Sequence, residues 1–294
     1  MSETFTELDN FISAHENVRI CILDNNNIQF CMHNKSYFPL EKIYEYYDII
    51  LIPGWVHAEI GQSDHRIQYI GEIPKPLFIL DEARDYLPLT NFEDERLMNV
   101  FLYASPPSSK PRKYLKTYLS KLEEKKRRIN AGEDIAIEEE MEEWIENYYR
   151  DGFDTKDTEQ GELKKNAGEI SILTLAFLML HFYGSKIKNV TISSSDRGVI
   201  DIKRNILDYA GKNDLLNVPL SNPIGFLSTD VLLAKAFDLG TINENMLCDL
   251  RKNRKFVMCS TSHEDGSSHL IETVLDTPDF ISIISGDNPY SIFF

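Results

Sequence analysis

Short apolar runs alternate along the chain with longer segments of helical periodicity. The apolar runs are rich in Val and Ile and are bounded by Asn, Asp, Gly, Pro or Ser, which predicts strands buried on both faces. They are VRICILD (18–24), DIILIPG (48–54), LFILD (77–81), NVTISS (189–194), NVPLS (217–221) and KFVM (255–258). The helical segments are GWVHAEIGQ (54–62), FEDERLMNVFLYA (92–104), GEISILTLAFLMLHFY (168–183), RGVIDIKRNILDYA (197–210), TDVLLAKAFDLG (229–240) and NENMLCDLRKN (243–253). Strands separated by helices require crossover connections, so we expect an α/β fold with a mostly parallel central sheet.

The segment from Lys110 to Asp151 departs from this alternation, because it carries two helical periods and no strand. The apolar residues of the first period are Tyr114, Leu115, Tyr118, Leu119 and Leu122. Those of the second period are Ile137, Met141, Trp144, Ile145 and Tyr148. Each set lies on one helix face, so we expect a helical hairpin inserted in the α/β core over residues 105–160.

The two arms of this expected hairpin carry opposite charge. Residues 110–128 contain nine Lys or Arg and two Glu, whereas residues 133–146 contain eight Asp or Glu and no basic residue. Antiparallel arms would pair across their exposed faces, each pair contributing roughly 0.2–1 kcal/mol. The alternative is that the basic arm contacts RNA or an acidic partner, through Lys125, Lys126, Arg127 and Arg128.

Composition predicts a globular protein of the cytoplasm. The chain has 294 residues and 42% hydrophobic content, enough for one large domain or two smaller ones. The N-terminus has no basic region followed by an apolar run, and the longest apolar stretch (170–184) is shorter than a membrane span. The four cysteines have no CxxC spacing. We therefore expect reduced cysteines and no membrane partner.

The net charge limits how this chain meets a nucleic acid. Lys and Arg total 31 against 47 Asp and Glu, giving a net charge of −16. Broad basic surfaces supply most non-specific affinity for phosphate, and this composition excludes one. Any polyanion must therefore be bound locally.

Four acidic residues are placed where a parallel sheet would gather them. Asp24 ends the first predicted strand, Glu59 lies in the helix after the second, Glu169 opens the most apolar helix, and Asp196 follows the serine-rich strand. Strand carboxyl ends and the helices that follow them share one edge of such a sheet. Singly, these acids could be a turn residue, a solvated helix residue, a first-turn charge and an N-cap.

Together, four carboxylates at one edge repel one another unless a cation lies between them. Mg²⁺ and Mn²⁺ prefer carboxylate and water ligands, and a pair of such ions can activate water in phosphodiester hydrolysis. No GxxxxGK[ST] loop is present and no GxGxxG follows a strand, so nucleotide-binding α/β folds lose support.

These residues resemble the acidic motifs of PIN-domain ribonucleases, in order: ICIL before Asp24, ILIPGWVHAEI with Glu59, KNAGEISILTLAF with Glu169 and VTISSSDRG with Asp196. Residues 218–258 are similar to the closing strand and helices of PIN-like toxins of the toxin–antitoxin class. The resemblance covers roughly residues 18–81 and 163–258. It implies a three-layer α/β/α PIN-like domain over residues 1–258, interrupted by the insertion, with a C-terminal extension over 259–294.

The resemblance also implies a function. Asp24, Glu59, Glu169 and Asp196 would be the catalytic, metal-binding acids of a Mg²⁺- or Mn²⁺-dependent endoribonuclease, a toxin or defence effector. Supporting residues would be Ser193 or Ser195 and, one helical turn after the fourth acid, Asp201. The partners implied are RNA, an antitoxin-like inhibitor protein and a second copy of the chain. The alternative is a PIN-like scaffold that binds nucleic acid or a protein without cutting.

Overall fold

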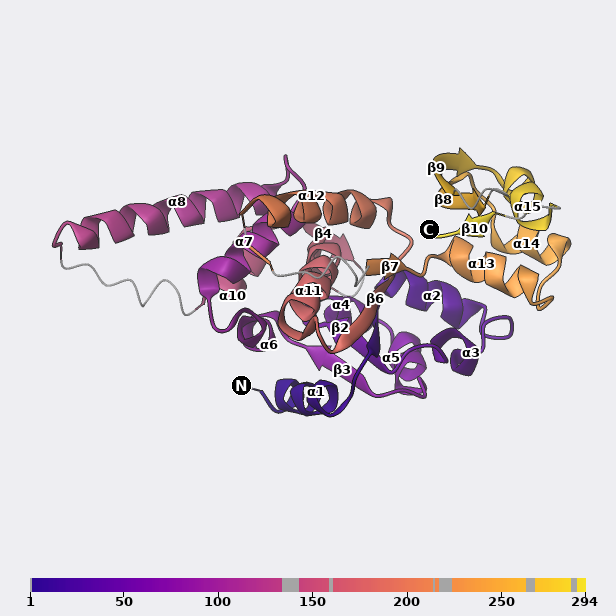
Figure 1. Cartoon of the computed structure of the whole chain (residues 1–294), viewed down its shortest axis with the longest axis horizontal. Coiled ribbons are helices and arrows are strands. Elements are labelled where there is room, and N and C mark those ends of the chain that lie inside the picture. The colour runs from indigo at the N-terminus through magenta and orange to yellow at the C-terminus, as the bar shows by residue number, and fades with distance from the viewer. Residues whose placement is uncertain are drawn as a thin grey trace.

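The protein is built on a five-stranded parallel sheet (Figure 1). The computed structural model describes residues 2–133, 143–158, 161–213, 215–216, 224–262, 268–286 and 290–294. The strand order is β3-β2-β1-β6-β7. The strands are β1 (Val18–Leu23), β2 (Ile49–Pro53), β3 (Leu77–Leu80), β6 (Ile187–Ser193) and β7 (Ile224–Phe226). Helices flank this sheet, which is consistent with a three-layer α/β/α arrangement and confirms the expected α/β class.

The strands are apolar on both faces because helices cover both. All five residues of β2 are buried, and Ile49, Ile50, Leu51 and Ile52 have no exposed surface. The helix α11 (Ala167–Tyr183) packs against β1, β2 and β6, and α1 (Glu3–Ala14) packs beside β3. Fourteen of the 17 residues of α11 are buried, so its apolar sequence reflects a central helix. Within the described ranges, no helix is both long and apolar enough to cross a membrane.

The order of the strands defines where a site is expected. Ile20 of β1 pairs with Ile49 of β2 on one side and with Val190 of β6 on the other. The chain runs from β1 outward through β2 and β3, and the later strands β6 and β7 extend the opposite side. The carboxyl ends of β1 and β6 therefore form a topological switch point, where open α/β sheets bind ligands.

The remaining helices around the sheet include three that were predicted and several short ones that were not. They are α2 (Asn25–His33), α3 (Leu40–Tyr44), α4 (Gly54–Ile60), α5 (Asp64–Gly71), α6 (Glu82–Asp85), a 3₁₀ turn (Leu87–Thr90), α7 (Asp94–Ala104) and α12 (Arg197–Asn213). The predicted helices 54–62, 92–104, 168–183 and 197–210 are confirmed as α4, α7, α11 and α12 with shifted ends. The predicted strand 217–221 lies outside the described residues.

The inserted segment contains a long helix, a short helix and a small hairpin. These elements are α8 (Lys110–Asn130), α10 (Trp144–Asp151), β4 (Thr155–Thr158) and the antiparallel β5 (Gly161–Lys164). Ser109 Oγ accepts the N–H of Arg112, which caps α8, and Leu115 and Leu122 are buried. α8 packs on α7 and α10 and extends away from the sheet (Figure 1). Ile137 and Met141 lie outside the described residues. The long first helix is confirmed as α8, the second described helix is short, and strand β4 lies within the expected bounds 105–160.

The C-terminal part forms a second, antiparallel sheet of strand order β10-β8-β9. Its elements are α13 (Thr229–Asp238), α14 (Glu244–Leu250), β8 (Lys255–Ser262), β9 (Ser268–Leu275), α15 (Thr277–Ser285) and β10 (Ser291–Ile292). The predicted strand 255–258 is thus confirmed as part of β8, but it lies in this antiparallel sheet and not in the parallel one. β8 also continues across the expected boundary at residue 258.

One close approach fixes how α4 leaves the parallel sheet. Glu82 is buried after β3, and its Oε1 accepts the N–H of Trp55 at 3.0 Å and the hydroxyl of Ser171 at 2.6 Å. A Cβ at Gly54 would lie 2.7 Å from Glu82 Oε2 and 3.3 Å from the Cα of Asp81. Glycine is therefore required where α4 begins, because the buried Glu82 has no room to retreat.

We expect Gly54→Ala to destabilise the protein by about 1–3 kcal/mol, because the added methyl group displaces Glu82 or the end of β3. Gly71→Ala is the matched control, since a Cβ there meets nothing within 4 Å. Removing this helical glycine should stabilise the fold by up to about 1 kcal/mol. Urea unfolding of both variants measures the difference, and equal stabilities would contradict the close packing at Gly54.

Candidate acidic active site

Asp24 and Ser194 join the two strand ends at the switch point. Asp24 follows β1 directly, is 5% exposed, and donates its backbone N–H to the carbonyl of Ser193 at 3.1 Å. Ser194 follows β6, and its hydroxyl donates to Asp24 Oδ2 at 2.7 Å. The same Ser194 oxygen accepts the N–H of Asp196 at 3.1 Å. One serine therefore fixes the first acid and the backbone of the fourth.

Asp196 both caps a helix and lies beside another acid. Its Oδ1 accepts the N–H of Gly198 at 2.7 Å, the interaction of an N-cap at the start of α12. A Cβ on Gly198 would lie 3.1 Å from Asp196 Oδ1 and 3.4 Å from Glu169 Oε2. Both carboxyls therefore border the same small space, which the absence of a side chain at position 198 leaves open. The capping explanation is correct for Asp196, and it does not remove the residue from the acidic cluster.

Glu59 lies where α4 meets the first turn of α11, which carries Glu169. A Cβ on Gly168 would lie 3.1 Å from Glu59 Oε1 and 3.2 Å from Val56 Cγ2. Gly168 thus lets α11 pack closely on α4 with the Glu59 carboxyl at the contact. Arg66 and Lys156 lie near enough to Glu59 to lower its pKa, which opposes the larger effect of burial.

The four carboxyls act on one another electrostatically. Burial raises the pKa of Asp24 to about 6, and the charge of Asp196 adds to that rise. Burial also raises the pKa of Glu59 to about 7, with a contribution from Asp24. The pKa of Glu169 rises to about 8 through burial first and then through Asp196, Asp24 and Glu59. The structure therefore places the four acids predicted from the sequence near one another, and the pKa values of Asp24, Glu59 and Glu169 are each raised in part by another acid of the cluster.

The carboxylate oxygens of this cluster are suitable ligands for a hard divalent cation, although they are not already arranged around one metal position. In the part of the chain that the structure describes, no group of three or more His, Cys, Asp and Glu side chains is arranged to hold a metal ion. The four carboxyls supply the oxygen ligands that Mg²⁺ and Mn²⁺ prefer, and a cation between them would relieve their repulsion. Side-chain rotation would be needed to complete a coordination shell.

The supporting residues expected from the sequence lie at different distances from the cluster. Ser193 is buried and accepts a hydrogen bond from Asn27 Nδ2 at 3.2 Å, and Ser195 donates to Asn27 Oδ1 at 2.7 Å. Both serines thus hold α2 against the end of β6. Asp201 is exposed on α12, 3.9 Å from Arg204, and the structure does not bring it to the acids.

Two residues of this region were missed by the sequence analysis. Ser194 is the serine that contacts Asp24, and nothing in a run of three serines distinguishes it. Glu82 lies at the same sheet edge, and burial raises its pKa to about 8. The sequence contains a signal for Glu82. This acid directly follows the predicted strand 77–81, just as Asp24 lies at the end of the first predicted strand.

The basic residues expected to contact RNA lie in the last turns of α8. Lys126 forms an ion pair with Glu95 of α7, Arg127 lies 3.8 Å from Glu123, and Arg128 lies 2.6 Å from Glu133. These pairs are exposed and so contribute little to stability. They join α8 to α7 and to the residues just after α8, and most of the expected acidic arm lies outside the described residues.

Comparison of the chain with protein-family models, with curated proteins and with solved structures finds no match. The interpretation of the site therefore rests on the position, burial and charge of its own residues.

We expect the metal-free protein to lose stability as the pH rises from about 4 to about 8. The pKa values of Asp24, Glu59 and Glu169 in the fold lie above the unfolded values of about 4. Over that window the native state binds more protons than the unfolded state, so the free energy of unfolding falls with pH. Glu169→Gln should flatten this dependence in EDTA, measured by urea unfolding at several pH values. Parallel curves for the variant and the wild type would contradict the coupling.

Proposed function

We propose that this protein is a PIN-like, Mg²⁺- or Mn²⁺-dependent endoribonuclease that hydrolyses RNA phosphodiester bonds. The observation that carries the proposal is the gathering of Asp24, Glu59, Glu169 and Asp196 at the switch point of a parallel sheet. Four distant sequence positions meet there, and three of them have pKa values raised by burial and by one another. Buried groups with perturbed pKa values concentrate at functional sites.

The four acids would hold the cation, and Ser194 would orient the cluster. The Ser194 hydroxyl donates to Asp24 Oδ2, and the backbone N–H groups of Asn25 and Asn26 also hydrogen-bond to this carboxylate. Gly168 and Gly198 keep side-chain bulk away from the carboxyls. Bound divalent cations supply an activated water and stabilise the leaving oxygen in phosphodiester hydrolysis. Because Asp24, Glu59 and Glu169 have raised pKa values, any protons that they hold must leave when a cation binds, so cation binding and proton release are coupled.

The alternative is a PIN-like scaffold that binds nucleic acid or a protein without cutting. One observation favours it: among the described residues, the acids are not already arranged around a metal-sized position. The inhibitor protein and the second copy of the chain stay predictions from the resemblance.

Asp196→Asn separates the helix cap from catalysis. Asn caps a helix about as well as Asp, so the variant should fold, and without metal it should be at least as stable as the wild type because repulsion is reduced. Its cleavage of single-stranded RNA with Mn²⁺ should fall by orders of magnitude. Asp24→Asn should behave alike, and the double variant should lose little more, because residues that act as one unit are not additive.

Metal binding is measured independently of cleavage. Mn²⁺ at about 100 times its dissociation constant should stabilise the wild type by about 2.7 kcal/mol relative to EDTA, and should stabilise Asp196→Asn less. Calorimetric titration in buffers of different ionisation enthalpy should detect proton release. If Asp196→Asn cleaves RNA at the wild-type rate, Asp196 serves only as a helix cap. If the wild-type protein binds metal but does not cleave RNA, the scaffold alternative is favoured.

Replacing Lys125, Lys126, Arg127 and Arg128 with Gln tests whether the end of α8 guides RNA. We expect weaker binding of single-stranded RNA and a flatter salt dependence, with the slope reduced by about 0.7 for each phosphate that the variant no longer neutralises. Binding is measured in EDTA at several salt concentrations. The control is Lys42→Gln, a change of one exposed cation that pairs with Glu45 near α3. Unchanged affinity would leave the end of α8 with a structural role only, in which Lys126, Arg127 and Arg128 form ion pairs within the protein.

A further inference from the structure

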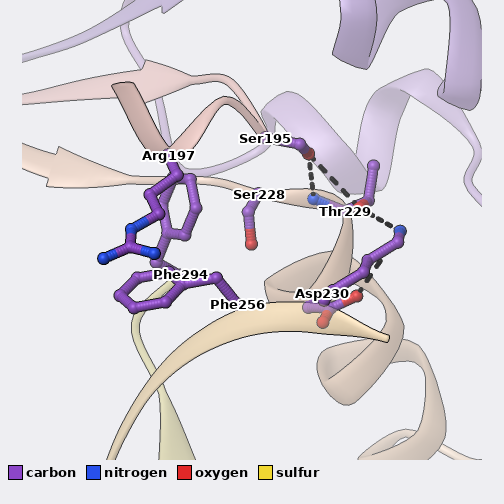
Figure 2. A pocket seen from close by; sticks show the side chains of 8 residues that line it. Ser195, Arg197, Ser228, Thr229, Asp230, Phe256 and Phe294 are labelled. Atoms are coloured by element: carbon purple, nitrogen blue, oxygen red, sulfur yellow. Dashed lines mark hydrogen bonds and ion pairs between the residues drawn. The ribbon is translucent and has the colours of Figure 1, made fainter. Parts of the chain in front are cut away.

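A pocket lies immediately beside the acidic cluster and is completed by the C-terminal part of the chain (Figure 2). Its volume is about 290 Å³, at the lower end of the range of small-ligand sites. Ser195 and Arg197, the two neighbours of Asp196 in the sequence, line it from one side. Thr229 at the start of α13 and Phe256 of β8 line it from others. The hydroxyl of Ser195 accepts the N–H of Thr229 at 2.9 Å, which joins the acidic edge to α13.

Positive charge exceeds negative charge at this pocket, in a chain whose net charge is −16. Arg197 is exposed at the rim, and Lys255 Nζ lies 3.1 Å from Thr229 Oγ1 and 3.7 Å from Asp230 Oδ1. The buried Arg251 already pairs with Asp230 at 2.9 Å. Two cations, Arg197 and Lys255, and one carboxylate, Asp230, therefore line the pocket, and the buried Arg251 pairs with that carboxylate without lining the pocket itself. The N-terminus of the ten-residue helix α13 adds partial positive charge.

Aromatic rings form one wall of the pocket, on the side opposite Thr229 and Asp230 (Figure 2). The guanidinium carbon of Arg197 lies 4.4 Å from the centre of the Phe256 ring. Phe294 lies against Phe256, with ring centres 6.2 Å apart. Phe294 is held in place by backbone hydrogen bonding to Met258, with a distance of 3.0 Å from Met258 N to Phe294 O. Aromatic and guanidinium planes are the surfaces on which nucleobases stack.

A buried acceptor in the same pocket has no hydrogen-bond donor among the residues that the structure describes. Asp230 has a side chain that is 3% exposed, and its Oδ2 accepts from Arg251 Nε at 2.9 Å. Asp230 Oδ1 has no hydrogen-bond partner within the described residues, because Lys255 is too distant for a hydrogen bond. An unsatisfied buried acceptor is costly, and a ligand that brings an N–H or O–H donor would satisfy it.

We propose that this pocket binds one nucleotide of single-stranded RNA, adjacent to the phosphodiester at the acidic cluster. Arg197 and Lys255 would meet a phosphate, the half-buried ring of Phe256, backed by the buried ring of Phe294, would meet the base, and Asp230 Oδ1 would accept from a base N–H or a ribose hydroxyl. The choice of RNA as the ligand rests on the proposed ribonuclease function. The pocket accounts for how a strongly acidic chain binds a polyanion at one place.

The test is the binding of a fluorescein-labelled single-stranded RNA oligonucleotide in EDTA, which prevents metal-dependent cleavage. Arg197→Gln and Phe256→Leu should each weaken binding about tenfold, the effect expected when a base loses a stacking or charged partner. Arg204→Gln is the matched control, because it removes one exposed cation from the same helix outside the pocket, and it should bind like the wild type. Thermal melting verifies that each variant is folded. If Phe256→Leu is unfolded, Arg197→Gln decides the test, because Arg197 is exposed and its replacement should leave the fold intact.

Competition on the wild-type protein identifies what is recognised. A nucleoside 5′-monophosphate should displace the labelled RNA at lower concentration than inorganic phosphate or an oligoglutamate peptide does. Equal competition by phosphate or by the peptide would overturn nucleotide recognition in favour of a general anion site. Wild-type affinity of Arg197→Gln and Phe256→Leu would overturn the pocket itself.

The experiments distinguish an error in the proposed nucleotide pocket from an error in the proposed ribonuclease activity. Asp24→Asn lies in the acidic cluster and should bind the labelled RNA in EDTA at least as tightly as the wild type. If Asp24→Asn cleaves RNA at the wild-type rate, the ribonuclease assignment falls while the affinities of the pocket variants still decide the nucleotide site. If the pocket variants bind normally, the nucleotide site falls whatever the cleavage rates are.

Discussion

The rest of this structure depends on one constraint, which is the free-energy cost of burying several carboxylates close to one another. One pKa unit corresponds to about 1.4 kcal/mol, and the total stability of a domain is only about 5–15 kcal/mol. The shifts at Asp24, Glu59 and Glu169 therefore cost a sizeable part of that stability. The surrounding structure offsets this cost with a dense apolar core, in which α11 and the strands beneath it are almost wholly buried. A fold selected for stability alone would place neutral side chains at this edge.

The sequence predicts the parallel sheet and its acidic edge because both depend on local patterns. Buried strands read as continuous Val and Ile runs, and a carboxylate that follows such a run must lie at the carboxyl edge. The antiparallel sheet was harder to predict. Strand β9 alternates exposed residues such as Leu270 and Val274 with half-buried ones, so its polarity pattern is weak. Contacts such as Ser194 with Asp24, 170 positions apart, depend on side-chain geometry that no local pattern encodes.

Polar contacts around α13 help to join the C-terminal part to the parallel sheet. Arg251 has no exposed surface, and its guanidinium pairs with Asp230 and stacks on Phe280 with 4.5 Å between the guanidinium carbon and the ring centre. Thr229 bonds to Ser195 on the acidic side and to Lys255 on the side of β8. The N-terminus of α13 thus joins the edge that carries the acids to the sheet that carries the aromatic rings.

The position of Phe294 in the sequence also sets an order of events during synthesis. All four acids precede residue 197, whereas the ring that closes the neighbouring pocket comes 98 positions after Asp196 (294 minus 196). At translation rates of about 5–20 residues per second, that interval lasts about 5–20 s. On the ribosome, a chain with a complete set of acids therefore exists for seconds before the pocket beside them can form.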